Sequence, residues 1–324
     1  MLSVTDLTVS IGPDEAPIDI VAGVSFSIEK GRILGLVGES GCGKSMTSLA
    51  VMGLLPHPGP RVRAGKVELA GSDVTRLAPW QRVEVGHARM AMVFQEPMTS
   101  LNPVRRIGDQ IVEAVQVHDR VTGAAAMARA RELLELVRIP DAAMQLSAFP
   151  HQLSGGMRQR VMIAVALACR PEVLIADEPT TALDVTVQFQ ILGLLRELCD
   201  KLDMAMLFIT HDMGVIAQLA DRVAVMYAGK IVETAPVKAL FAAPAHPYTR
   251  GLMACMPIRG VGTRTLATIP GQAPQPGSIT AGCRFAPRCV QAQAVCRTDM
   301  PPRVPIASEH EALCHFPITD GRPL

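Results

Sequence analysis

A short run near the N-terminus has the residue types and spacing needed to bind phosphate groups. Glycines in such a run let backbone N–H groups turn inward around phosphate oxygens, and a helix that follows adds the positive end of its dipole. Within it, Lys44 would reach the β- and γ-phosphates, and the Ser45 hydroxyl would ligate Mg²⁺. The run therefore predicts a nucleotide site that uses Mg²⁺. It follows the pattern G-x-x-x-x-G-K-S and consists of Gly38, Glu39, Ser40, Gly41, Cys42, Gly43, Lys44 and Ser45.

The flanking residues predict the elements that position this loop. The apolar run before it, Arg32 to Val37, has the length of a strand, and Met46 to Met52 can form a helix. Cys42 could make the loop sensitive to thiol reagents, although a tolerated small residue is the more common reason for a cysteine here.

Two carboxylates follow a second apolar run. The residues from Glu172 to Ala176 predict a buried strand, and Asp177 and Glu178 come at its end. Asp177 suits the Mg²⁺ shell and Glu178 suits polarisation of an attacking water, whereas an ordinary acidic strand end is the alternative.

A third motif places small residues at the start of a helix. Ser154, Gly155 and Gly156 predict a cap whose free N–H groups form an anion site. An ordinary N-cap is the alternative. A second phosphate site on one chain makes sense if it serves the nucleotide of a neighbouring subunit.

The rest of the pattern predicts an α/β protein. Alternation over residues 1 to 28 predicts an antiparallel β layer, and amphipathic periods predict a helical insertion. Later strands alternate with helices, as in a parallel sheet that binds ligands at the carboxyl ends of its strands.

Composition excludes several classes of protein. The 31 basic and 30 acidic residues nearly cancel and aromatic residues make up 3%, so no nucleic-acid surface is indicated. The longest apolar run, Val161 to Cys169, is far shorter than the roughly 20 residues that span a bilayer. The acidic N-terminus lacks the charged start of a secretion signal, so we expect a cytosolic chain.

Four cysteines gather near the C-terminus with the spacing C-x5-C-x6-C-x17-C. In a reducing cytosol, clustered cysteines favour a metal over disulfides, although this spacing is neither a zinc ribbon nor a ferredoxin run. An iron-sulfur cluster, a structural zinc that also uses His310 or His315, and thiols without metal all stay open. The four are Cys283, Cys289, Cys296 and Cys314.

In this order, the motifs resemble those of the ATP-binding subunits of ATP-binding-cassette (ABC) transporters, over essentially the whole chain. The resemblance adds a Q-loop glutamine that bridges Mg²⁺ and the membrane subunits, and a histidine that contacts the γ-phosphate. It makes Glu178 the catalytic base and assigns the Ser154 motif to the partner's ATP. The Q-loop glutamine is Gln95, which would bind Mg²⁺ together with Ser45 and Asp177, and the histidine is His211. The resemblance also identifies Ala182-Leu183-Asp184 as the D-loop.

Further stretches resemble the dipeptide, oligopeptide and nickel importer branch. They are Phe94 to Pro103, His246-Pro247-Tyr248-Thr249 and Gly282 to Cys289. This implies ATP and Mg²⁺ as cofactors and a 4Fe-4S centre on the four cysteines. The implied partners are a second, homologous ATPase in a heterodimer, two transmembrane permeases and an extracytoplasmic solute-binding protein. The implied location is the cytoplasmic face of the membrane.

The resemblance implies an ABC-type P-loop ATPase fold with two parts. Residues 1–245 form the nucleotide-binding domain, with a helical subdomain at about 97–170, and residues 246–324 form a Cys-rich extension. One departure is Ile11, which stands where the family has an aromatic residue that stacks on adenine.

Two rival functions remain. A soluble ABC ATPase that acts on ribosomes or DNA would usually carry two cassettes or a long coiled coil, and this chain has neither. A regulatory subunit that binds nucleotide without turnover would not need Glu178 and His211.

Overall fold

A computed structural model describes most of the chain. The chain divides into two compact units, which are treated separately below. Unit 1 contains residues 28–32 and 69–208 together with Met1, and unit 2 contains residues 2–27, 33–68 and 209–324. The described residues are 1–75, 77, 81, 89–95, 100–119, 121–181, 183–256, 268–279 and 281–319.

In unit 2, the N-terminal strands form the predicted β layer. Strands β1 (Leu2–Ile11), β2 (Ile18–Ile28) and β4 (Arg61–Leu69) lie in the order β2-β1-β4. Leu2 and Val4, and then Leu7 and Val9, are buried along β1, and the positive φ of 48° at Asp6 lies where the alternation of buried residues shifts by one position.

The second sheet of unit 2 is mixed rather than purely parallel. Strand β3 (Ile33–Val37) pairs in parallel with β9 (Arg222–Tyr227), and β10 (Lys230–Pro236) then runs antiparallel to β9. A C-terminal hairpin of β11 (Arg303–Ala307) and β12 (His310–Leu313) continues the sheet through β10. The sequence patterns predicted none of these antiparallel strands.

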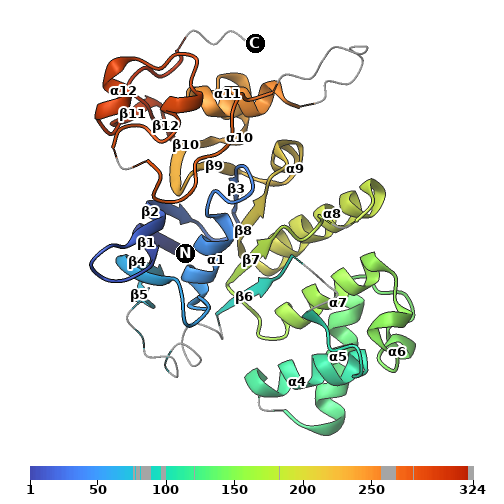
Figure 1. The fold of residues 1–324 in the computed structure, drawn as a ribbon. Helices are drawn as coiled ribbons and strands as arrows, with labels where there is room; N and C mark the ends of the chain where they lie inside the picture. The colour runs from blue at the N-terminus through green and yellow to red at the C-terminus, as the bar shows by residue number, and fades with distance from the viewer. Residues whose placement is uncertain are drawn as a thin grey trace. The chain divides into compact units, whose positions relative to one another are not determined.

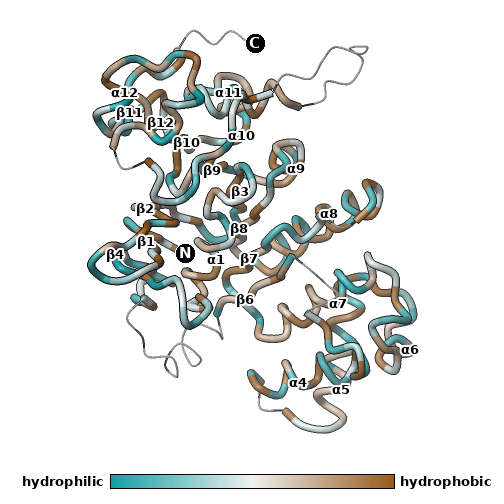
Figure 2. The backbone as a smooth tube through the Cα atoms, in the orientation of Figure 1, coloured by the Kyte–Doolittle hydropathy of each residue, from teal (hydrophilic) through white to brown (hydrophobic). Residues whose placement is uncertain are grey.

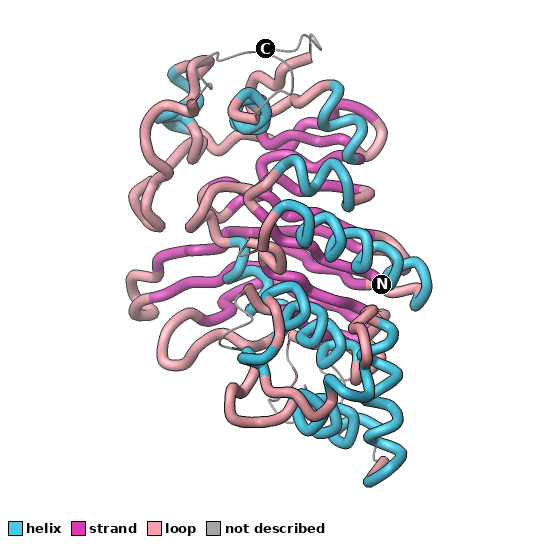
Figure 3. Tube along the Cα trace, turned by 90° about the vertical axis from the view of Figure 1, so that its right-hand side faces the viewer, coloured by secondary structure: helices cyan, strands magenta, loops and turns pink. Residues whose placement is uncertain are grey.

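The helices of unit 2 are short, and much of the chain after α11 is loop (pink in Figure 3). Residues 257–282 are rich in Pro and Gly; of these, 257–267 and 280 lie outside the described residues, and the described parts, 268–279 and 281–282, form neither helix nor strand. The helices are α1 (Lys44–Met52), α9 (Met213–Leu219), α10 (Val237–Ala242), α11 (Pro247–Ala254), η3 (Ala286–Arg288) and α12 (Ala294–Thr298).

In unit 1, a parallel pair of strands carries the predicted carboxylates. Strand β6 (Met90–Val93) pairs with β7 (Val173–Asp177), with Met90 opposite Val173. The next strand, β8 (Ala205–Thr210), begins in unit 1, and every residue of β7 and β8 is buried. Complete burial explains why these strands read as continuous apolar runs. Unit 1 also holds the two-residue strand β5 (Ser72–Asp73).

Except for one helix that follows β7, the helices of unit 1 lie in the predicted helical stretch (green in Figure 1). Ile107, Ile111 and Val115 are fully buried on one face of α4, and brown and teal residues alternate along these helices in Figure 2. Among the described residues, no helix is long and apolar enough to cross a bilayer. The helices are α4 (Ile107–Asp119), α5 (Gly123–Leu136), α6 (Ala142–Gln145), η2 (Pro150–Gln152), α7 (Gly155–Leu167) and α8 (Val185–Leu202).

Candidate functional site

The predicted phosphate loop joins β3 to α1, so the expected strand, loop and helix are present. Gly43 caps α1 with a φ of 108°, a conformation that side chains disfavour. A Cβ at Gly38 would come within 2.1 Å of the Met226 carbonyl oxygen. Glycine is therefore required at both positions by the backbone path.

Lys44 folds back over its own loop. Its Nζ donates hydrogen bonds to the carbonyl oxygens of Gly38 at 2.8 Å and Glu39 at 3.1 Å, and only 5% of the residue is exposed. The ammonium is thus held at the loop, where phosphate oxygens could replace the two carbonyls. Ser45 is exposed at the start of α1, as a Mg²⁺ ligand would have to be.

Cys42 is enclosed by the loop. It is 3% exposed, and burial raises the pKa of its thiol even though the Lys44 charge acts in the opposite direction. The thiol is therefore protonated at neutral pH and poorly reactive, which favours a packing role over thiol sensitivity.

Glu178 is held by two neighbouring side chains in unit 1. Its Oε2 accepts hydrogen bonds from Gln95 Nε2 at 3.2 Å and Thr181 Oγ1 at 3.0 Å. Its backbone has a φ of 46°, which is uncommon for a residue with a side chain. Asp177, directly before it, is 6% exposed at the end of β7. The predicted acidic pair and the Q-loop glutamine therefore meet at one place.

The Ser154 motif (Ser154 to Gly156) and the D-loop residues both lie against one valine. Ser154 caps α7, and a Cβ at Gly156 would approach Val187 Cγ1 to 2.6 Å. Asp184 caps α8 by accepting a hydrogen bond from the Val187 amide at 2.9 Å. Glycine at position 156 therefore lets the start of α7 approach α8. Ala182 lies outside the described residues.

His211 lies in unit 2, in the loop between β8 and α9, and its side chain is exposed. The adjacent Asp212 caps α9 by accepting a hydrogen bond from the Gly214 amide at 2.7 Å. The residues predicted for one ATP site are thus divided: the phosphate loop and His211 belong to unit 2, and Gln95, Asp177 and Glu178 belong to unit 1.

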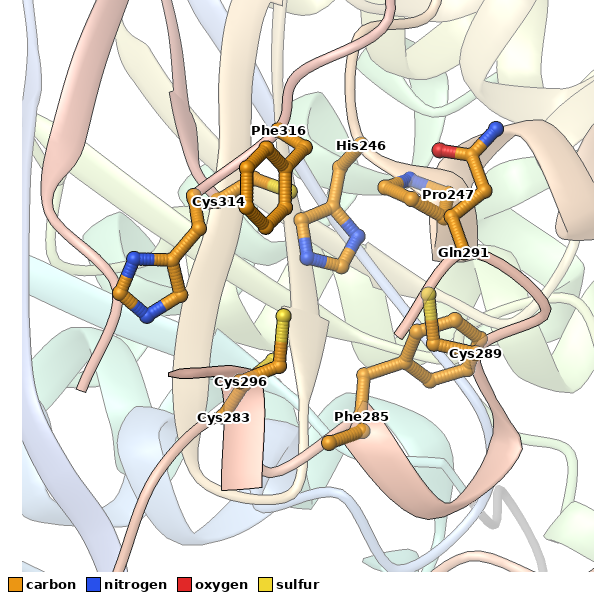
Figure 4. Close-up of a pocket in the computed structure, with 11 residues that line it drawn as sticks. His246, Pro247, Cys283, Phe285, Cys289, Gln291, Cys296, Cys314 and Phe316 are labelled. Atoms are coloured by element: carbon orange, nitrogen blue, oxygen red, sulfur yellow. The ribbon is translucent and has the colours of Figure 1, made fainter. Parts of the chain in front are cut away.

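The four C-terminal cysteines line one pocket in unit 2 (Figure 4). Phe285 and Phe316 contribute apolar walls. Burial raises the pKa of three of the thiols, to about 11 for Cys314, so these thiols are protonated at neutral pH unless a cation binds them. Among the described residues, no group of three or more His, Cys, Asp or Glu side chains is placed to hold a single metal ion.

The C-terminal segment also contacts the phosphate loop, which the sequence analysis missed. Arg288 forms an ion pair with Glu39 at 2.7 Å, and the Tyr248 hydroxyl accepts a hydrogen bond from the Glu39 amide at 3.0 Å. In the sequence, this contact was indicated only by two stretches that resemble the importer branch. They are His246–Thr249 and Gly282–Cys289.

His246 explains one of those stretches. Its Nδ1 accepts a hydrogen bond from the Tyr248 amide at 3.0 Å and caps α11, and Pro247 occupies the first helical position. His246 is 1% exposed. Burial lowers its pKa to about 4, although the charge of Glu233 acts in the opposite direction.

A pH dependence of stability follows from this cap. Because the pKa of His246 is lower in the folded chain than the unfolded value of about 6.5, the unfolded chain takes up a proton first as the pH falls. We expect the free energy of unfolding to be unaffected above pH 6.5 and to fall by roughly 1 kcal/mol per pH unit below it. Urea unfolding at pH 7.5, 6 and 5 measures this. His246→Asn keeps an acceptor for the cap and should flatten the profile, and an identical slope in both proteins would contradict the assignment.

The comparisons with known proteins cover the whole chain. Residues 21–181 match the ABC transporter family, and residues 232–296 match the C-terminal region of oligopeptide/dipeptide transporters. The chain is 48% identical to the dipeptide transport ATP-binding protein DppD of Escherichia coli, over 100% of this chain and 99% of that one. It is 47% identical to the oligopeptide transport ATP-binding protein AppD of Bacillus subtilis, over 93% of this chain and 92% of that one. The chain belongs to the ATP-binding proteins of the ABC transporter family.

Solved structures agree with this assignment at the level of the fold. The ABC cassette MJ0796, solved as a dimer with ADP and Pi, superimposes with a TM-score of 0.64 at 24% identity, over 73% of this chain and 99% of that one. The protein cbiO1 of Clostridium perfringens, part of the ABC transporter complex cbiONQ, gives a TM-score of 0.65 at 24% identity, over 74% of this chain and 90% of that one. The predicted ABC ATPase fold is therefore confirmed, and this ABC protein is an ATPase by family. The comparisons do not by themselves support a metal on the cysteines.

Proposed function

We propose that this ABC ATPase energises the import of dipeptides or oligopeptides. The observation that carries the proposal is similarity along the full length to DppD, named as a dipeptide transport protein, and to AppD, named as an oligopeptide transport protein. The match to the oligopeptide/dipeptide transporter C-terminal region extends it beyond the cassette. The alternative function, an ATPase that acts on ribosomes or DNA, is less well supported, because the sequence has neither the second cassette nor the long coiled coil usual in such proteins.

Each motif residue takes a role in ATP hydrolysis. Lys44 would bind the β- and γ-phosphates, and His211 would contact the γ-phosphate. Ser45, Gln95 and Asp177 would hold Mg²⁺, which neutralises charge that develops on the phosphates. The exposed Ser45 hydroxyl and the Asp177 carboxylate at its strand end supply the oxygen ligands that Mg²⁺ prefers.

Glu178 would act as the general base. Gln95 and Thr181 both donate to its Oε2, which orients the carboxylate. A fixed carboxylate can accept a proton from water as the water attacks the γ-phosphate, and it transfers that proton on when the product leaves.

Partners follow from the second anion site. Ser154 to Gly156 and Asp184 would contact the ATP of a second, homologous ATPase, so that two subunits complete each other's sites. The exposed Ser154 at the start of α7 supports this role. Two permeases and an extracytoplasmic solute-binding protein would complete the importer, with this chain on the cytoplasmic face of the membrane. The domain boundary near residue 245 is likewise a proposal.

The cysteine pocket would hold an iron-sulfur cluster. Four thiols line one pocket with apolar walls, as cluster ligation by cysteine requires.

Metal analysis tests the cluster. Protein purified without oxygen should be brown and contain iron and sulfide, and Cys296→Ser should bleach it while ATP binding survives. Cys169→Ser, outside the pocket, is the matched control. Zinc without iron, or no metal in freshly prepared protein, would contradict the cluster.

Growth tests the proposed function in cells. A strain lacking this chain should fail to grow when a dipeptide is its only source of a required amino acid. The wild-type chain should restore growth, and Lys44→Ala should not, because it removes the phosphate-binding ammonium. Unchanged dipeptide uptake in the deletion strain would count against the proposal, provided that no second importer is present.

A further inference from the structure

We propose that Arg288 and Tyr248 are positioning residues for the phosphate loop, and that Arg288 neutralises Glu39 so that the loop can accept a polyanionic nucleotide. The inference rests on the proposed nucleotide binding by Gly38 to Ser45. It gives the C-terminal segment a part in ATP binding.

The ion pair between Arg288 and Glu39 has the geometry of a strong one. Nη1 donates to Glu39 Oε2 at 2.7 Å and Nη2 donates to Oε1 at 3.1 Å, so both carboxylate oxygens are held. The side chains are 7% and 27% exposed. Solvent therefore screens this pair less than an ordinary surface pair.

Arg288 is itself fixed before any ligand arrives. Its Nε donates to the Pro270 carbonyl at 2.9 Å, and its guanidinium carbon lies 5.8 Å from the centre of the Tyr227 ring. These contacts orient the guanidinium toward Glu39. Little rotamer freedom is left to lose when the ion pair forms.

Tyr248 fixes the backbone of the same loop residue. The hydroxyl accepts from the Glu39 amide, and the Tyr248 ring lies 4.6 Å from the Tyr227 ring and 5.4 Å from that of Phe285. The chain has only two tyrosines, and both lie in this ring cluster. Glu39 is thus held at its amide and at its carboxylate.

The ion pair between Arg288 and Glu39 matters for ATP binding because Glu39 is part of the phosphate loop. Its carbonyl oxygen accepts the Lys44 Nζ hydrogen bond at 3.1 Å, so Glu39 is directly connected to the lysine expected to bind phosphate. Without Arg288, a partly buried carboxylate would repel the several negative charges of ATP. With Arg288, the loop presents the Lys44 charge alone.

Charge substitutions test this on the full-length chain with Mg-ATP. Titration calorimetry should show that Arg288→Ala weakens ATP binding by roughly ten- to hundredfold. Glu39→Gln alone should bind ATP at least as tightly as the wild type, because the charge of Arg288 is then no longer compensated and adds to that of Lys44. The double variant should recover most of the loss. In the assembled transporter, Arg288→Ala should raise the KM for ATP more than it lowers kcat.

Arg303→Ala is the matched control, because it removes a surface pair with Glu311 at 2.7 Å in the same C-terminal segment. It should bind ATP as the wild type does. Wild-type affinity in Arg288→Ala would overturn the inference, and so would a double variant no tighter than the single one. If Arg288→Ala does not fold, the affinity of Glu39→Gln for ATP tests the inference. A tenfold loss of ATP affinity in that folded variant would contradict the proposal that Arg288 neutralises Glu39.

Lys44→Ala separates this inference from the proposed function. If the wild type binds no ATP, or Lys44→Ala binds it equally well, the proposed nucleotide site itself fails. If Lys44→Ala abolishes binding while Arg288→Ala leaves it unchanged, only the role of Arg288 fails.

Discussion

Replacing Glu178 by Gln is expected to slow ATP hydrolysis by the assembled transporter by about 10² to 10⁴, the range for loss of a positioned acid or base. The amide keeps the size of the side chain and an oxygen acceptor for Gln95 and Thr181, but it cannot take a proton from water. ATP binding should survive, and ATP should remain trapped in the closed dimer. Steady-state hydrolysis and retention of labelled ATP measure the two effects.

Glu172→Gln is the matched control for this change. Glu172 precedes the same strand at its opposite end and forms a half-buried ion pair with Arg89. We expect it to hydrolyse ATP at nearly the wild-type rate. Near-normal hydrolysis by Glu178→Gln in a transporter whose second ATPase is also inactivated would contradict the role of Glu178.

Replacing Ser154 by Arg is expected to abolish most turnover while leaving ATP binding to the isolated chain intact. The long cation would occupy the start of α7, where the partner's nucleotide is proposed to bind, and it would remove the hydrogen bond from the Met157 amide at 3.3 Å. The loss should therefore appear only after assembly with the second ATPase.

Thr122→Arg makes the same change at an exposed N-cap of another helix in unit 1, α5, where the side chain makes no capping bond. It should retain activity. A large loss of ATP affinity in the isolated Ser154→Arg chain would show that Ser154 serves its own chain's nucleotide instead.

Local patterns were enough to predict the phosphate loop, the two carboxylates at the end of β7 and the cap at Ser154. Each of these depends on residues adjacent in sequence, where a glycine, a strand end or a helix start determines the backbone. Strands β7 and β8 could also be predicted from the sequence, because complete burial on both faces requires continuous apolar runs.

The contacts between the C-terminal segment and the loop could not be predicted from local patterns. Arg288 and Glu39 lie 249 residues apart, and Tyr248 and Glu39 lie 209 apart. The hairpin of β11 and β12 was missed for a related reason. Its strands are short and half exposed, so they lack a strong apolar period, and the cysteine spacing dominated the interpretation of that region.

The most direct test of this account measures ATP hydrolysis and peptide uptake in the same preparation. The chain is assembled with its permeases, second ATPase and solute-binding protein in liposomes, and labelled dipeptide is supplied. We expect the dipeptide to stimulate hydrolysis and to accumulate inside only when ATP is present, with both lost in Glu178→Gln. Hydrolysis that proceeds without uptake, ignores every peptide tested and responds instead to ribosomes or DNA would contradict the account.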